Sequence, residues 1–318
     1  MTRFVLRRVL LLAVTLAVAS VLIFAMTSVL PGDVGRIILG PFASDQAVAA
    51  LNHDLGLDRP VAVRYLDWMG GVLTGDWGRS LSLDVQVLPL ALERLGRSMI
   101  LALYALLLMV PLAIASGVVA GRRAGGVFDR VVSVAGLALG AMPEFVTGVV
   151  LIMVFGIGLG WLPVQALPPE GAGWAQALRH LLMPALSLVL LMFAYLFRMT
   201  RAGMIDELNA DYTRTAVLKG LPGPVVIRRH VLRNALLPTI TVIGAQLGWL
   251  VGGLVVVESL FRYPGIGSLM QTAAANKDIP LLGGCALLIT VIYGVANLLA
   301  DVLYAALNPR VRQGMGRA

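Results

Sequence analysis

Long apolar segments alternate with polar ones along this chain. An α-helix rises about 1.5 Å per residue, so about 20 apolar residues cross a hydrocarbon core about 30 Å thick. Segments that meet or approach this length are 9–30, 98–121, 131–159, 181–197, 234–257 and 279–300. The pattern predicts an all-α integral membrane protein with six transmembrane helices.

Three of these segments have features that bear on the prediction. Glu144 interrupts 131–159, and 181–197 is short but ends at Arg198, whose long side chain reaches back to the membrane interface. Basic residues precede 9–30 as in a signal peptide, and 17–19 resembles a cleavage site. Cleavage would leave an apolar stub, and the run is too long for a signal peptide, so we expect a retained anchor.

Composition agrees with a membrane protein. The chain is 58% hydrophobic and 13% charged, whereas soluble domains carry about 25% charged residues. The net charge of +8 is spread between the apolar segments instead of forming one basic stripe, so we expect no nucleic-acid partner. Cys285 is the single cysteine, which excludes a disulfide within the chain.

The basic residues predict the orientation in the membrane. Arginine and lysine are enriched before residue 9, in 122–130, in 198–233 and after residue 309, and these regions alternate with the other connections. Basic connections stay on the cytoplasmic side, and long translocated loops such as 31–97 escape this rule. Both termini are therefore expected in the cytoplasm.

The connection 198–233 is too polar for the bilayer and too long for a simple turn. Residues 211–220 are typical of a short helix ended by Gly220, 221–224 of a turn, and a second helix is expected from about Val225. On physical grounds alone a solvated basic hairpin is favoured, and the alternative is a rigid knob on which a soluble partner acts.

The residues of this connection resemble a known family. Tyr212-x-Arg214-Thr215-Ala216-x-x-Lys219-Gly220, followed by Arg229-His230-x-Leu232-Arg233, is similar to the ATPase-docking loop of binding-protein-dependent ABC importer permeases. The branch is the dipeptide/oligopeptide/nickel one. Arg214 and Thr215 replace the glutamate and first alanine of the wider superfamily, and Arg233 stands at its proline position. The docking residues that the resemblance implies are Tyr212, Arg214, Thr215, Ala216, Lys219, Gly220, Leu221, Arg229, His230 and Arg233.

The resemblance extends over nearly the whole chain. Further motifs of this branch lie at 55–60, 75–80, 142–145, 160–163, 258–267 and 301–310, the last with Asn308 where an aspartate is expected. It implies the type I ABC importer permease fold, with an N-terminal helix and external loop in 1–97. A five-helix core is implied in 98–318, with the docking loop at 198–233.

The resemblance also implies the partners. They are a homologous second permease subunit, two ATPase subunits and an external solute-binding protein, all at a bacterial inner membrane, with the lipid bilayer around the helices. Binding-protein contacts are expected at Asp76, Trp77, Arg79 and Arg262. The expected cargo is a di- or oligopeptide, and nickel complexes, glutathione or sugar derivatives are alternatives.

No cofactor is expected in this chain. The sequence lacks the Gly-x-x-x-x-Gly-Lys-Ser/Thr loop that cradles nucleotide phosphates, so ATP and Mg²⁺ are expected on the partner subunits.

Acidic residues at membrane depth are functional candidates by default. Glu144 and Glu258 are therefore pore or gate candidates, and the alternative is a helix-end carboxylate paired with an arginine or a backbone donor. A membrane-embedded enzyme using these residues with His180 or Asp301 is a rival hypothesis. It lacks clustered ligands, and a secondary transporter lacks clear paired broken helices.

Glycine recurs every four residues at Gly244, Gly248 and Gly252. This spacing is typical of a close-packing helix face, and equally of the general abundance of glycine in membrane helices.

Overall fold

The computed structural model describes residues 2–29, 34–40, 42–54, 56 and 58–307. These residues form two compact units. The first contains Met99–Tyr263, with the described residues before Leu10 and after Ile292, and the second contains Leu10–Ser98 and Pro264–Ile292. Leu55, Leu57, Asn308 and the C-terminal arginines of the sequence motifs lie outside the described residues. The predicted division of the chain into an N-terminal region, 1–97, and a five-helix core, 98–318, stays a prediction.

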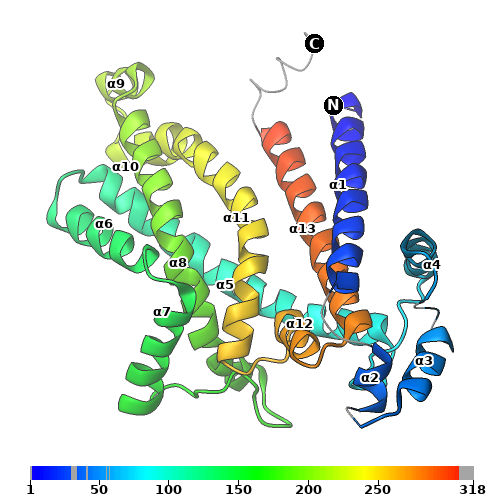
Figure 1. Ribbon diagram of the computed structural model, residues 1–318. Coiled ribbons are helices and arrows are strands. Elements are labelled where there is room, and N and C mark those ends of the chain that lie inside the picture. Colours follow the sequence, from blue (N-terminus) through cyan, green and yellow to red (C-terminus); the bar gives the residue numbers. More distant parts are fainter. Residues whose placement is uncertain (1, 30–33, 41, 55, 57, 308–318) are drawn as a thin grey trace. The chain divides into compact units, whose positions relative to one another are not determined.

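Four helices are long and apolar enough to cross a membrane. They are α1 (Thr2–Val29), α5 (Val87–Arg122), α8 (Trp174–Leu208) and α13 (Ile279–Leu307), labelled in Figure 1. A fifth span results if the bent pair formed by α6 (Val127–Gly140) and α7 (Glu144–Leu151), with the π-helix η1 (Ile152–Gly158), is counted as one. Helix α11 (Leu232–Leu260) contains the predicted segment 234–257, and several of its central side chains are not described.

The predicted segment 131–159 is not one straight helix. Its two parts are bent by 108° at a break next to Pro143. Proline has no backbone N–H and disfavours the helical conformation of the residue before it, so the helix stops and restarts here. Glu144 therefore opens α7 as its first residue instead of interrupting a continuous span, and its side chain is half-buried.

Other helices are longer than the apolar segments that predicted them. Helix α8 runs beyond 181–197 on both sides, and α5 begins at Val87. The apolar pattern detects only the part of a helix at membrane depth, and neither Arg198 nor Arg201 breaks a helix. Between residues 31 and 87 the structure adds α2 (Val34–Leu39), α3 (Asp45–Asp54) and α4 (Val61–Thr74), which the sequence did not predict.

The core of the first unit lies among α5, α7, α8 and α11. Its largest fully buried side chains include Leu101, Met109, Leu188, Leu254 and Phe261. Glycine permits the closest helix contact, because a Cβ atom at Gly203 of α8 would lie 2.4 Å from the backbone oxygen of Ala235 in α11. Prolines 111, 184 and 238 lie inside α5, α8 and α11, as membrane helices tolerate.

The core of the second unit joins the start of α5 to α12 (Ile266–Ala275) and the start of α13. Val87, Ile266, Leu281 and Cys285 are buried there. The backbone N–H of Ile266 donates to Ser98 Oγ at 2.8 Å, which satisfies a donor at the start of α12.

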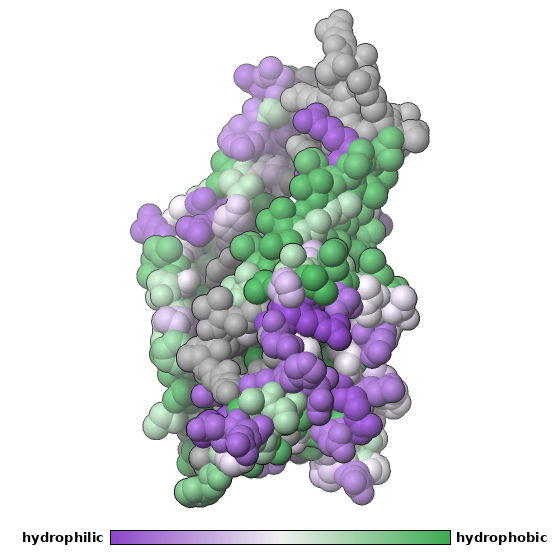
Figure 2. Space-filling view, turned by 45° about the vertical axis from the view of Figure 1, so that its right-hand side comes forward, coloured by the Kyte–Doolittle hydropathy of each residue, from purple (hydrophilic) through white to green (hydrophobic). Residues whose placement is uncertain are grey.

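Many large apolar side chains remain exposed on the surface. Helix α1 exposes Leu10, Val14, Val18, Leu22 and Met26, and Figure 2 shows broad hydrophobic areas on the face that it draws. Soluble monomers rarely leave such contiguous apolar areas uncovered, so lipid or partner helices must cover them.

Candidate functional site

An exposed knob follows directly on the end of α8. It consists of α9 (Asp211–Leu218), α10 (Gly223–Val226) and the π-helix η2 (Ile227–Val231), which continues into α11 (Figure 1). The prediction of a short helix followed by a turn is confirmed. The second helix begins at Gly223, two residues before the predicted start at about Val225, because Pro224 fits the first turn of a helix, where its missing N–H costs nothing.

Gly220 ends α9 in a left-handed conformation with φ of +74°. Its N–H donates to the carbonyl of Val217 at 2.9 Å, and the N–H of Leu221 donates to that of Ala216 at 3.4 Å. These two bonds form a Schellman motif, which satisfies carbonyls that the helix end would otherwise leave unpaired. The motif confirms the predicted role of Gly220 in ending the helix.

A small core holds the knob in place. Ala216 of α9 packs with Val226, Val231, Met204 and Ala235. Ala216 is 6% exposed, so it shapes the knob from within and offers almost no surface to a partner.

Polar contacts fix α9 against its neighbours. The Tyr212 hydroxyl donates to the Glu207 carboxylate, and Asn234 Nδ2 donates to the Tyr212 hydroxyl at 3.1 Å. Thr213 Oγ1 donates to the Glu207 carbonyl at 2.7 Å. Partial burial and the contact with Glu207 raise the pKa of Tyr212, so its phenol stays neutral and keeps donating. Tyr212 thus ties α9 to the end of α8 and the start of α11.

The outer surface of the knob combines basic and apolar side chains. Four predicted basic residues are exposed, namely Arg214, Lys219, Arg229 and Arg233. Between them lie exposed apolar residues, with Leu218 79% and Val217 58% exposed, accompanied by Leu221 and Val225. We call this set of eight residues the knob surface.

Sequence reasoning included Leu221 in this surface but missed Val217, Leu218 and Val225. No local pattern separates these residues, because it is the burial of Thr213 and Ala216 by the fold that leaves the other apolar residues of α9 outside. Thr215 is exposed on α9, and His230 is half-buried in η2.

An ion pair joins the C-terminal part of α8 to the first turn of α6. Arg201 of α8 binds the Asp129 carboxylate through Nε and, at 2.7 Å, through Nη2. Asp129 is 2% exposed and also accepts the backbone N–H of Gly125 at 2.8 Å. The sequence did not predict that Arg201 and Asp129 interact.

The residues predicted to contact a binding protein differ in their surroundings. Asp76, Arg79 and Arg262 are exposed, and Arg262 adopts a φ of +52°. Trp77 is half-buried, packs against the core of the second unit and donates from Nε1 to the Val72 carbonyl at 3.2 Å. Trp77 is therefore the least accessible of the four.

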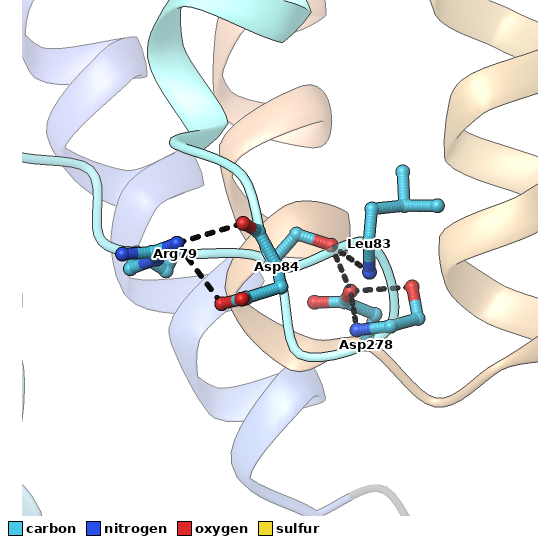
Figure 3. A network of polar contacts seen from close by, with 6 residues as sticks. Arg79, Leu83, Asp84 and Asp278 are labelled. Atoms are coloured by element: carbon cyan, nitrogen blue, oxygen red, sulfur yellow. Dashed lines mark hydrogen bonds and ion pairs between the residues drawn. The ribbon is translucent and has the colours of Figure 1, made fainter.

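Figure 3 shows how the loop next to these residues is held. Arg79 binds the Asp84 carboxylate at 3.0 Å, and the buried Asp278 accepts from Ser80 Oγ at 2.5 Å and from Ser82 N at 2.9 Å. Burial raises the pKa of Asp278, but the hydrogen bonds from both serines outweigh it and hold the pKa below its usual value. The same carboxylate accepts Leu281 N at 3.2 Å and so caps α13.

The remaining acidic candidates lie on three different helices, α7, α11 and α13. Glu258 is fully buried in α11, whereas Glu144 is half-buried at the start of α7. Asp301 forms an ion pair with Arg8 at 2.6 Å. His180 Nδ1 lies 2.8 Å from the Gln165 carbonyl. Among the described residues, no group of three or more histidine, cysteine or acidic side chains is placed to hold a metal ion.

A chain of membrane-crossing helices with a helical knob between two of them has the organisation of a membrane transport subunit. Comparison with known families agrees. The model of the binding-protein-dependent transport system inner membrane component matches residues 109–313, and that of the N-terminal part of such components matches 1–84. The chain belongs to this family.

Curated relatives are similar over nearly their whole length. The probable peptide ABC transporter permease protein y4tP of Sinorhizobium fredii (strain NBRC 101917 / NGR234) is 36% identical, covering 97% of this chain and 99% of the relative. The di/tripeptide transport system permease protein DppB of Pseudomonas aeruginosa (strain UCBPP-PA14) is 35% identical over 98% and 99%. The glutathione transport system permease protein GsiC of Salmonella choleraesuis (strain SC-B67) is 35% identical with the same coverage.

These relationships define the role of the chain. It is a multi-pass inner-membrane permease subunit of an ABC importer, and it works in a complex with ATPase and binding-protein partners. It is a transport subunit and not an enzyme, which overrules both rival hypotheses.

Proposed function

We propose that the knob surface is where an ATPase subunit docks, and that this chain forms half of an import pore with a homologous second permease. Two ATPase subunits, which bind ATP and Mg²⁺, would drive the pair, and the cargo is a di- or oligopeptide. The observation that supports docking most strongly is the exposed apolar surface on α9, flanked by basic residues.

The composition of the knob surface fits a soluble protein partner. Leu218 and its apolar neighbours lie in the polar connection 198–233, where lipid would not cover them. An apolar centre with a charged rim is the usual composition of a protein interface. The core beneath α9 and the Schellman motif at Gly220 keep this surface rigid, so force applied to α9 moves its neighbours with it.

Two helices lead from the knob into the membrane. Helix α8 ends three residues before α9, and α10 passes through η2 into α11 without a break. Short π-helical segments are frequently found at functional sites, and η2 lies where the knob meets the long helix. We infer that motion of the knob rotates α8 and α11 together, which changes the packing around the pore.

Contacts between connections support six spans with both termini in the cytoplasm. Arg201 and Asp129 join the two internal connections expected in the cytoplasm. Ala166 N donates to the Phe261 carbonyl at 3.0 Å, which joins the third and fifth connections, both expected outside. The Arg8–Asp301 ion pair joins the two terminal regions. In each of these contacts, both residues belong to segments that are predicted on the same side of the membrane. The four long helices, the bent pair of α6 and α7, and α11 together make six spans.

The curated relatives support peptides as cargo. Two of the three relatives named above are called peptide or di/tripeptide permeases, and the third is called a glutathione permease. Glutathione is the second candidate for this reason. Nickel complexes and sugar derivatives stay open as alternatives.

The docking proposal is tested by placing a charge in the knob surface. Leu218→Asp and Arg214→Glu should each reduce co-purification of the ATPase subunits and abolish uptake. Leu73→Asp is the matched control, because Leu73 is 80% exposed on α4 and Leu218 is 79% exposed on α9. If Leu218→Asp retains the ATPase as well as Leu73→Asp does, the knob is not the docking site.

The topology is tested with single cysteines in a Cys285→Ser background. An impermeant thiol reagent added to intact cells should label Thr74→Cys and Glu170→Cys. Ala124→Cys and Lys219→Cys should be labelled only after the membrane is permeabilised. Labelling of Lys219→Cys in intact cells would show that the knob lies outside the cell, where an ATPase subunit could not reach it, and would contradict the proposed topology.

A further inference from the structure

A pocket of about 320 Å³ lies inside the second unit. It is formed by the last turns of α1, by α4 with the loop that follows it, and by the start of α13. Its walls include three aromatic residues, Phe24, Trp68 and Trp77, and three charged ones, Arg64, Asp67 and Asp76. None of the residues that line the pocket belongs to the knob or to the core beneath it.

The walls of this pocket are fixed by specific contacts. The rings of Phe24 and Trp68 lie 5.6 Å apart, and those of Phe24 and Tyr65 lie 5.5 Å apart edge to face. The hydroxyls of Ser20 and Tyr65 are 2.9 Å apart, and Ser20 is buried. Helix α4 is therefore docked on α1 through an aromatic cluster, and the pocket has a defined shape.

The charges around the pocket suit a zwitterion. Arg64 lines the pocket, with its guanidinium 6.0 Å from the centre of the Phe24 ring, and its charged N–H donors suit an anionic group such as a phosphate. The carboxylates of Asp67 and Asp76 and the aromatic faces suit an ammonium group. Asp67 lies 3.4 Å from Arg59, but both side chains are mostly exposed and such pairs exchange partners easily.

The pocket lies at the end of two membrane-crossing segments. The candidate span of α1 is Val5–Thr27, so Phe24 and Thr27 occupy its last turn, and Ile279 opens the span of α13. Exposed apolar side chains on the side of α1 nearer Phe24 continue along the span, including Val21, Val14 and Leu10. Aromatic residues gather at this depth in membrane proteins, where acyl chains give way to head groups.

We propose that this pocket binds the head group of an amine-bearing zwitterionic phospholipid, phosphatidylethanolamine. The phosphate lies against Arg64, the ammonium against Asp67, Asp76 and the aromatic faces, and the acyl chains lie along the apolar surface of α1. The pocket and its charges do not depend on the proposed topology. The proposed topology puts this pocket at the outer leaflet, and only that placement depends on the topology.

The ammonium of phosphatidylethanolamine donates hydrogen bonds, whereas the quaternary amine of phosphatidylcholine does not. The two carboxylates therefore favour the former. Phosphatidylglycerol has no ammonium and leaves both carboxylates without a partner. The site predicts a preference for phosphatidylethanolamine over both other lipids.

The test uses the complete importer, purified with its ATPase and second permease subunits. It is reconstituted in nanodiscs of phosphatidylethanolamine mixed with phosphatidylglycerol or with phosphatidylcholine, and retained lipid is counted by native mass spectrometry. Arg64→Gln should weaken phosphatidylethanolamine retention about tenfold or more, as expected for one charge-assisted contact. Arg79→Gln is the matched control, because Arg79 is exposed in the same unit and outside the pocket.

A second variant tests the ammonium side independently. Asp76→Asn keeps an oxygen for the backbone N–H of Gly78, which Asp76 binds at 3.0 Å, but removes the charge. It should reduce the preference for phosphatidylethanolamine over phosphatidylcholine. Lipid should still be retained, because its phosphate still binds Arg64. Because this variant changes one exposed side chain, it keeps the proposal testable if Arg64→Gln fails to assemble.

Four outcomes would overturn the proposal. They are equal retention of all three lipids, unchanged retention in both variants, displacement of lipid by a dipeptide, and displacement by the binding protein. The last two would assign the pocket to cargo or to the partner. The measurement needs neither ATP nor transport, so its failure leaves the docking proposal intact, and failure of the docking experiment leaves the lipid site intact.

Discussion

Gly220 offers a direct test of how the shape of the knob controls coupling. Its φ of +74° lies in the left-handed region, and a Cβ atom added there would meet no heavy atom within 4 Å. Substitution therefore causes no clash, and its whole cost is backbone strain of about 1–2 kcal/mol for an L-residue. Asparagine tolerates this conformation better than alanine, and β-branched valine tolerates it least.

Gly223 provides the matched control within the same knob. It opens α10 without a left-handed φ, and a Cβ atom there would likewise meet nothing within 4 Å. Gly223→Ala should change stability little, because the gain from restricting the unfolded chain offsets the crowding that Pro224 imposes on a helical residue before it. The two alanine variants thus differ in backbone conformation and not in packing.

The assays are thermal unfolding of the purified chain in detergent, co-purification of the ATPase subunits, and uptake by cells. The strain is small against the insertion of the membrane helices, so membrane levels should be normal. We expect ATPase association and uptake to fall in the order Gly220→Asn, Gly220→Ala, Gly220→Val, with Gly223→Ala at the wild-type level. Equal effects of the two alanine variants, or none for Gly220→Val, would refute the reasoning.

Three further predictions concern contacts that hold the helices together, each measured by unfolding of the purified protein. Arg201→Ala leaves the Asp129 carboxylate buried without its bidentate partner and should lower the free energy of unfolding by about 3 kcal/mol. A double-mutant cycle with Asp129→Asn that shows no coupling energy would contradict this. Asp278→Asn should cost about 1–3 kcal/mol at neutral pH, because its amide meets the serine donors. Folding lowers the pKa of Asp278, so its carboxylate stabilises the fold at pH values above its ordinary pKa near 4. This stabilisation is lost as the pH falls through the pKa of the folded state. Only the wild type should therefore lose stability in this acidic range, since Asp278→Asn has no carboxylate there. Gly203→Ala should cost about 1–3 kcal/mol by forcing α8 from α11, whereas Gly96→Ala, with nothing within 4 Å, should cost nothing.

The sequence by itself determined the features that depend on neighbouring residues. Apolar segments of about 20 residues predicted α1, α5, α8 and α13, because length and apolarity suffice to make a membrane helix. Gly220 predicted the end of α9 for a similar reason, since a helix cap involves only the adjacent turn. The motifs in 198–233 pointed to the family that the comparisons confirm.

The bend at Pro143 and the helices of the first loop were harder to predict. Pro143 lies within the predicted segment 131–159, but only the fold shows a change of direction of 108° there. Helices α2, α3 and α4 contain too few continuous apolar residues to be detected as membrane segments. Their position on neighbouring elements, as in the contact of Tyr65 with α1, gives them their role.

Only the tertiary structure decided which distant residues meet. Arg201 binds a carboxylate 72 residues away, and Ser80 binds one 198 residues away. No local pattern marks such partners, because they are brought together by the packing of whole helices. The same packing buries Ala216 and leaves Leu218 exposed on one short helix. Sequence therefore determined the long membrane helices and the family, and the fold determined the surfaces, because which side a helix exposes depends on what packs against it.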